Sequence, residues 1–234
     1  MGSSTAGYVL LDDVGPSDQT ADVRLEVPDS IPICEFYSNE DYGRRPLATS
    51  RAPYTCGITG LSYSAFEVRD RTAALSRALA KRLEFAPNKG TEWDKVVCLF
   101  SANSIDYITA CHAVHRLSGI VTPASAAYMV DELTSQLKAS DSKAIFTCVK
   151  LLPVALEAAR RHNVAEEKVF LFEMHDDPKR MPEKHTTVNQ LIAEGRSLPE
   201  LEPLKWSKGQ GKRQTAFLSC SSGTSGLPVC LGNS

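Results

Sequence analysis

The feature that most constrains the fold is a regular alternation between residues 95 and 172. Short, almost wholly apolar runs occupy residues 95–100, 120–123, 143–148 and 168–172. Stretches with helical spacing separate them, at residues 104–117, 130–137 and 151–162. Strands this apolar are typical of a parallel sheet that is covered on both faces. The pattern therefore predicts an α/β domain, with a mostly parallel sheet flanked by helices.

The segments on either side of this alternation are less regular. Residues 1–45 show no sustained period, and we expect an arm that lies over a surface, with Ile31, Ile33 and Phe36 as its anchors. Residues 58–63 indicate the end of a hairpin, after which Ser64 is expected to cap a helix that continues to Leu83. A short helix over 187–193 and an apolar run over 215–218 follow later in the chain.

Composition excludes several classes of function. The 234 residues carry 26 basic and 28 acidic side chains, so the formal net charge is −2. This balance gives no general reason to expect nucleic acid or an anionic membrane as a partner. The chain shows neither a signal-peptide pattern nor an apolar run near the ~18 residues of a spanning helix. We therefore expect a cytoplasmic protein, and the last residues show no peroxisomal signal.

Cysteine and histidine spacing gives no support for a metal site. The seven cysteines contain no C-x-x-C pair, and we interpret them as small buried hydrophobes. His112 and His115 lie three residues apart, a spacing that suits chelation on one helical face. No third ligand is evident beside them, so we expect these two histidines to pack rather than to bind metal.

One segment near the end of the chain carries chemistry. It combines hydroxyl side chains with two glycines directly after an apolar run, and its residues are Ser221, Ser222, Gly223, Thr224, Ser225 and Gly226. Glycines allow close backbone approach to a ligand, and successive N–H groups in such a loop form an anion-binding concavity. Each hydrogen bond to a charged phosphate contributes about 1.5–3 kcal/mol. On composition alone, a flexible tail is the alternative.

Other nucleotide and hydrolase motifs do not fit this segment. No Gly-Lys-Ser/Thr follows the glycines, which excludes a Walker loop. The Gly209-Gln210-Gly211 sequence lacks a third glycine and precedes the apolar run, which excludes a dinucleotide loop. The nucleophile elbow G-x-S-x-G is also absent, because Leu227 stands where its second glycine belongs.

A resemblance resolves the choice. Residues 221–228, SSGTSGLP, resemble the phosphate-binding motif of the AMP-forming (adenylate-forming) acyl-CoA synthetases, and in particular the fungal 4-coumarate-CoA-ligase-like enzymes. Residues 61–66, LSYSAF, are similar to that family's L-T-Y-x-E-L segment, and residues 102–107, ANSIDY, to its P-N-S-x-E-Y segment. Further similarity runs from residue 112 to residue 133. The resemblance spans about residues 28–228 in unbroken order.

The resemblance implies a two-step reaction. A carboxylate attacks the α-phosphate of Mg·ATP to give an acyl-adenylate and pyrophosphate, and coenzyme A then displaces AMP. Residues 221–226 would cradle the phosphates, with Thr224 as the preferred hydroxyl contact. The implied partners are ATP, magnesium, CoA and a small carboxylic acid of unidentified type. No catalytic residue is assigned within this chain.

The chain also departs from the family. Val229 stands where the motif expects Lys or Arg, and the ribose-binding aspartate, the catalytic lysine and the small C-terminal domain are absent. We therefore divide the chain into an arm (1–45), an incomplete AMP-binding domain (46–228) and a non-family tail (229–234). We expect the chain alone neither to adenylate nor to bind ATP tightly, and a sheet interrupted here to leave an edge open to self-association.

Three interpretations stay open. The chain is the N-terminal portion of a carboxylate–CoA ligase, or a non-catalytic truncated paralogue that acts as an interaction module, or part of an adenylating enzyme that serves a carrier protein. A codon argument bears on the tail: Val229-Cys230 can be encoded by GTATGT, which is a fungal intron donor. We hypothesise that the sequence from Val229 onward is translated intron.

Overall fold

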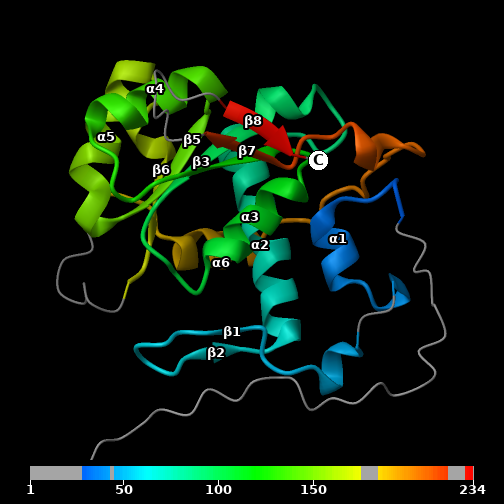
Figure 1. Ribbon diagram of the computed structural model, residues 1–234. Helices are drawn as coiled ribbons and strands as arrows, with labels where there is room; N and C mark the ends of the chain where they lie inside the picture. Colours follow the sequence, from blue (N-terminus) through cyan, green and yellow to red (C-terminus); the bar gives the residue numbers. More distant parts are fainter. Residues whose placement is uncertain (1–27, 43–44, 175–183, 221–229, 234) are drawn as a thin grey trace, which may run out of the picture.

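The main body of the protein is a six-stranded sheet with helices on both sides (Figure 1). A computed structural model describes residues 28–42, 45–174, 184–220 and 230–233. The strand order is β6-β5-β3-β4-β7-β8, in which all neighbours pair in parallel except β7 and β8. The α/β class and the mostly parallel sheet predicted from the sequence are therefore confirmed.

The elements follow the predicted alternation closely. The strands are β1 (Tyr54–Thr55), β2 (Ser62–Tyr63), β3 (Val96–Phe100), β4 (Ile120–Ala124), β5 (Ala144–Cys148), β6 (Val169–Phe172), β7 (Phe217–Cys220) and β8 (Cys230–Asn233). The helices are α1 (Ile33–Ser38), α2 (Ala65–Leu83), α3 (Tyr107–His115), α4 (Val130–Ser140), α5 (Leu152–His162) and α6 (Val188–Arg196). All four predicted apolar runs between 95 and 172 are strands, and the helices between them differ from prediction only at their ends.

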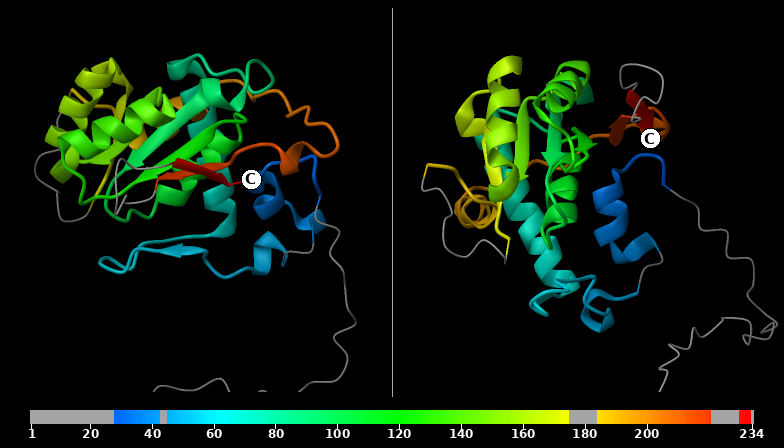
Figure 2. Two further views of the ribbon diagram at one scale, coloured as in Figure 1. Left: turned by 45° about the horizontal axis from the view of Figure 1, so that its top comes forward. Right: turned by 60° about the vertical axis from the view of Figure 1, so that its left-hand side comes forward.

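Two layers of helices enclose the sheet, one on each face (Figure 2). Alternate residues of each strand contribute to each layer: in β6, Phe170 and Phe172 pack with α2, α3 and α6, whereas Val169 and Leu171 pack with α4 and α5. Strands β3, β5 and β6 are buried along their whole length, as their apolar composition requires. Within the described residues, no helix is both long enough and apolar enough to cross a bilayer.

Local sequence signals explain how the first layer begins. Tyr54 pairs with Tyr63 in an antiparallel hairpin, as residues 58–63 predict. Ser64 then caps α2: its hydroxyl accepts a hydrogen bond from the Glu67 amide, and the Glu67 carboxylate accepts one from the Ser64 amide. Later in the layer, α6 lies close to α2 at Gly195, where a Cβ atom would overlap the main-chain carbonyl of Ala74.

The N-terminal arm differs from prediction in two respects. It contains a short helix, α1, which packs on α3. The sequence pattern did not predict this helix. Its anchor is Cys34, only 5% exposed, whereas Ile33 is 44% exposed and is not an anchor. A helix of six residues is too short to show a 3.6-residue repeat, so only its apolar content was visible in the sequence.

The sheet ends at β6 on one side and at β8 on the other. The edge of β6 is partly covered, because the Leu171 amide donates to the Thr186 carbonyl and Leu171 forms a bridge with Thr187. Strand β8 lies in the segment interpreted as a non-family tail, and all four of its residues have register partners in β7. Association of two copies through either edge stays a prediction.

Candidate functional site

The topology points to one edge of the sheet. Strands β3 to β7 are parallel, so their carboxyl ends share that edge. The chain leaves β3 toward α3 in one layer and leaves β4 toward α4 in the other. Adjacent strands whose connections diverge in this way open a crevice at their carboxyl ends, which is where ligands bind in open α/β sheets.

The predicted phosphate cradle follows directly from this edge. Strand β7 ends at Cys220, next to Ser221 in the sequence. The cradle residues Ser221, Ser222, Gly223, Thr224, Ser225 and Gly226 themselves lie outside the described residues. The described residues that flank them, Cys220 and Cys230, are register partners across β7 and β8. The described residues on either side of the segment therefore both lie at the carboxyl edge.

Strand β7 is held in place from three sides. The Val121 amide in β4 donates to the Ala216 carbonyl at 3.0 Å, and the buried Thr122 hydroxyl donates to the Leu218 carbonyl at 2.8 Å. From α4, the side-chain Nε2 atom of Gln136 donates to the Thr122 hydroxyl at 2.7 Å. From α3, the Nε2 atom of His115 lies 3.0 Å from the Ala216 carbonyl oxygen. A fixed strand gives the segment that follows it a defined starting point.

The cysteine interpretation holds for four buried residues, is wrong for Cys220, and does not hold for Cys56, which is only half-buried. Cys34, Cys98, Cys111 and Cys148 are buried free thiols. Cys220 was expected to be a small buried hydrophobe, but it is disulfide-bonded. No disulfide was predicted for Cys220, because the cysteine spacing in the sequence shows no recognised disulfide pattern.

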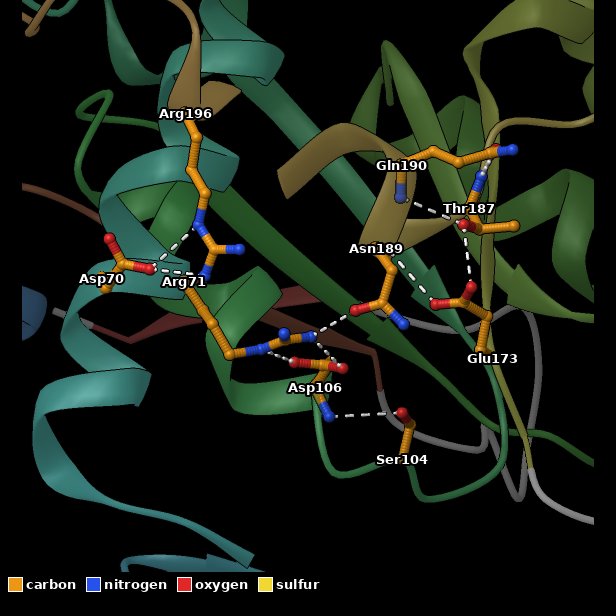
Figure 3. A network of polar contacts seen from close by, with 9 residues as sticks. All are labelled: Asp70, Arg71, Ser104, Asp106, Glu173, Thr187, Asn189, Gln190 and Arg196. Carbon is orange, nitrogen blue, oxygen red and sulfur yellow. Dashed lines mark hydrogen bonds and ion pairs between the residues drawn. The ribbon is translucent and has the colours of Figure 1, made fainter. Parts of the chain in front are cut away.

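A buried polar network lies at the same edge and was not predicted (Figure 3). The Arg71 guanidinium of α2 makes two hydrogen bonds to the Asp106 carboxylate, at 2.9 and 2.7 Å, and a third to the Asn189 side-chain oxygen of α6 at 2.7 Å. It also stacks 4.3 Å from the centre of the Tyr63 ring. Burial raises the pKa of Asp106, and the Arg71 charge opposes that rise.

A second part of this network caps α6. The Glu173 carboxylate, which directly follows β6, accepts hydrogen bonds from the Thr187 hydroxyl at 3.1 Å and the Asn189 amide at 3.2 Å. Thr187 in turn forms a capping box with Gln190. The network therefore joins α2, α6 and the loops after β3 and β6. Both Asp106 oxygens are occupied, which suits a positioning role rather than ligand contact.

The two histidines occupy packed positions on α3. The His112 ring lies 5.3 Å from the ring of Tyr37, and the His115 ring lies 4.9 Å from that of Phe217. Burial lowers the pKa of each to about 4, so both are neutral near pH 7. In the part of the chain that the structure describes, no group of three or more His, Cys, Asp or Glu residues is placed to hold a metal ion.

Comparison with known proteins agrees with this geometry. The AMP-binding enzyme family model matches residues 53–229, which include the cradle. Acyl-CoA ligase easD of Emericella nidulans is 40% identical over 207 residues, and acyl-CoA ligase cm3C of Cordyceps militaris is 35% identical over 222 residues. These alignments cover 87% and 85% of this chain, but 37% and 33% of the relatives. The chain thus spans about a third of the length of those proteins.

Solved structures show the same fold at low sequence identity. The anthranilate CoA ligase AuaEII, in complex with anthranoyl-AMP, superposes with a TM-score of 0.69 at 16% identity, over 89% of this chain and 35% of its own. The red-emitting luciferase of Phrixothrix hirtus gives 0.66 at 18% identity, over 88% and 36%. The family match over residues 53–229 confirms the resemblance noted in the sequence: the chain belongs to the AMP-binding enzyme family.

Proposed function

We propose that this chain supplies the phosphate-binding part of an ATP-dependent carboxylate–CoA ligase. The overall reaction converts a carboxylic acid, ATP and CoA into acyl-CoA, AMP and pyrophosphate. One observation carries the proposal: the family match runs through residues 221–226, and the strand before them ends at the ligand-binding edge of the sheet.

The proposed role of residues 221–226 is to stabilise negative charge on the phosphates. Negative charge moves onto pyrophosphate as the carboxylate attacks the α-phosphate. Backbone N–H groups and the hydroxyls of Ser221, Ser222, Thr224 and Ser225 would donate to those oxygens, while Gly223 and Gly226 would let the backbone approach them. Magnesium would neutralise part of the phosphate charge when bound, and no residue of this chain is assigned to it.

We expect the chain by itself to bind Mg·ATP weakly. Val229 is neutral where the resemblance expects Lys or Arg, so one point charge toward the phosphates is missing. Isothermal titration with Mg·ATP should show no binding in the micromolar range, and Val229→Lys should tighten whatever binding is measured. A micromolar dissociation constant for the unchanged chain would contradict this expectation.

A chimera tests the function itself. Residues 53–228 are placed in acyl-CoA ligase easD of Emericella nidulans in exchange for the matching segment, and pyrophosphate release is measured with that enzyme's own acid. We expect the chimera to release pyrophosphate, and Thr224→Ala within it to lower the rate by about 10-fold or more, as expected for a lost transition-state contact.

Ser219→Ala provides the matched control. Ser219 is an exposed hydroxyl in β7, five residues before Thr224, so its removal should leave the rate unchanged. A folded chimera without pyrophosphate release would overturn the proposed function. Equal rates for the Thr224→Ala and unchanged chimeras would remove Thr224 from the cradle.

A further inference from the structure

A second cavity lies away from the carboxyl-edge site. It has a volume of about 370 Å³ and is enclosed by α1, α2, α3 and the segment 200–204. The α2 residues on its wall, such as Val68, Thr72 and Ser76, alternate with those that pack toward the sheet, such as Leu75 and Leu79. The cavity therefore opens on the outer side of the first helical layer. Its volume falls within the range of about 300–1,000 Å³ typical of small-molecule sites.

One part of the wall is apolar. It is formed by side chains from α1, α2 and the segment 200–204, including Cys34, Val68, Ala73, Leu201 and Leu204. Cys34 and Val68 are each only 5% exposed. His112 adds an aromatic ring that is neutral near pH 7. This part of the wall suits the hydrocarbon or aromatic body of a ligand.

The other part of the wall is charged, with cations in excess. Three guanidinium groups (Arg69, Arg77, Arg116) face two carboxylates (Glu35, Glu200), which leaves a net charge of +1. Arg77 is 11% exposed and is engaged by Glu200 at 2.6 Å. A ligand with several negative charges would be repelled by the two carboxylates. A ligand with one negative charge would neutralise the net charge of the wall.

Arg116 is the cation that a ligand would use. Its Nη2 atom donates only to main-chain carbonyls, those of Leu201 at 3.4 Å and Glu202 at 3.0 Å. Its Nη1 atom is buried with no hydrogen-bond partner among the described residues. Across those residues, no carboxylate lies within ion-pair distance of this guanidinium. A planar guanidinium without a counter-ion is matched geometrically by a carboxylate.

From the excess cation and the apolar wall together, we propose that this cavity binds a monocarboxylate with an apolar body, whose carboxylate pairs with Arg116. Two sources share this chemistry, a medium-chain fatty acid and an aromatic acid. The proposal does not rest on the carboxyl-edge site, because none of the cavity residues named here belongs to it. The result of the chimera experiment therefore neither supports nor contradicts this proposal, which has a separate test.

The test uses the 234-residue chain and two probes, octanoate and cinnamate, titrated by calorimetry. The probe that fits should bind with a dissociation constant of about 1 mM or below, and its neutral amide should bind at least about 10-fold more weakly. Arg116→Gln should weaken the acid by about 10-fold or more while leaving the amide unchanged. Arg82→Gln is the matched control, since Arg82 pairs with Glu194 outside the cavity.

Ala73→Leu gives an independent variant, because the larger side chain would fill the cavity from α2. It should abolish binding of acid and amide alike, with the unfolding midpoint checked to confirm that the variant folds. Several outcomes would overturn the proposal: no saturable binding of either acid near 1 mM, equal binding of acid and amide, or full binding by both Arg116→Gln and Ala73→Leu. Preference for octanoate or for cinnamate would identify the source.

Discussion

The two helical layers use the same strands but differ in how many charged or titratable side chains they bury. The layer of α2, α3 and α6 contains buried charged or titratable side chains, among them Arg71, Asp106, His112 and His115. The layer of α4 and α5 places its ion pairs on the outside, where Glu157 receives hydrogen bonds from Arg160 and Arg161. Each layer packs apolar side chains on the sheet, so the difference lies in the charged and titratable side chains.

What covers each layer explains the contrast. The first layer is overlain by α1 and by the segment 200–204, which contacts Arg116 and Arg77. Polar groups there are removed from water and must find partners in the protein. The second layer has no such cover within the described residues, so its charges keep their hydration. Equivalent-looking ion pairs should therefore differ greatly in what they contribute to stability.

The largest expected effect comes from breaking the buried pair. Asp106→Ala should lower the free energy of unfolding by about 3–5 kcal/mol, because it leaves the Arg71 guanidinium buried without a counter-ion. Urea unfolding followed by circular dichroism measures this change. The double variant Arg71→Met with Asp106→Leu should be less destabilised than Asp106→Ala, because it leaves no buried charge. A double variant that is as unstable as the single one would show that shape, rather than charge, dominates here.

The histidines of the same layer should give the next largest effect. Burial lowers the pKa of His112 and His115 to about 4, from about 6.5 in an unfolded chain. The unfolded state therefore binds more protons between these values, and stability is lost as pH falls from 6.5 toward 4. In this window, each histidine should contribute a slope of about 1.4 kcal/mol per pH unit.

Urea unfolding at a series of pH values measures the slope. His115→Gln should flatten it by about half, and His112→Gln should do the same. If the slope between pH 6.5 and pH 5 is unchanged in both variants, other groups control the acid sensitivity and the burial argument fails.

The two layers also show what sequence can and cannot reveal. The strands, and the start of α2 at Ser64, follow from local patterns: apolar runs of a few residues and a capping box. The pairing of Arg71 with Asp106 joins residues 35 positions apart, and no local pattern connects them. Asp106 lies in a segment that resembles the family, but the resemblance did not indicate that Asp106 pairs with Arg71.

At the carboxyl edge too, local sequence patterns were predictable and contacts between distant residues were not. The glycine and hydroxyl pattern selected residues 221–226 as a candidate segment, and the parallel topology explains why the strand before it ends at the carboxyl edge of the sheet. The sequence did not reveal the contacts that hold β7, such as Thr122 to Leu218, 96 residues apart. Strand β8 and the bonded state of Cys220 were missed because the residues after 228 depart from the family pattern.

The smallest expected effect belongs to the second layer. The Glu157 carboxylate receives hydrogen bonds from Arg160 and Arg161, which lower its pKa to about 2, but the side chain lies at the surface with 35% of its area exposed. Water screens such pairs, so Glu157→Gln should leave the urea midpoint unchanged within error at neutral pH. The same measurement made alongside Asp106→Ala compares one ion pair from each layer under identical conditions. A shift in the urea midpoint for Glu157→Gln that reaches half the Asp106→Ala shift would mean that the outer side of α5 is covered in solution. The two layers would then differ in which residues form their ion pairs, and not in how far those pairs are exposed to water.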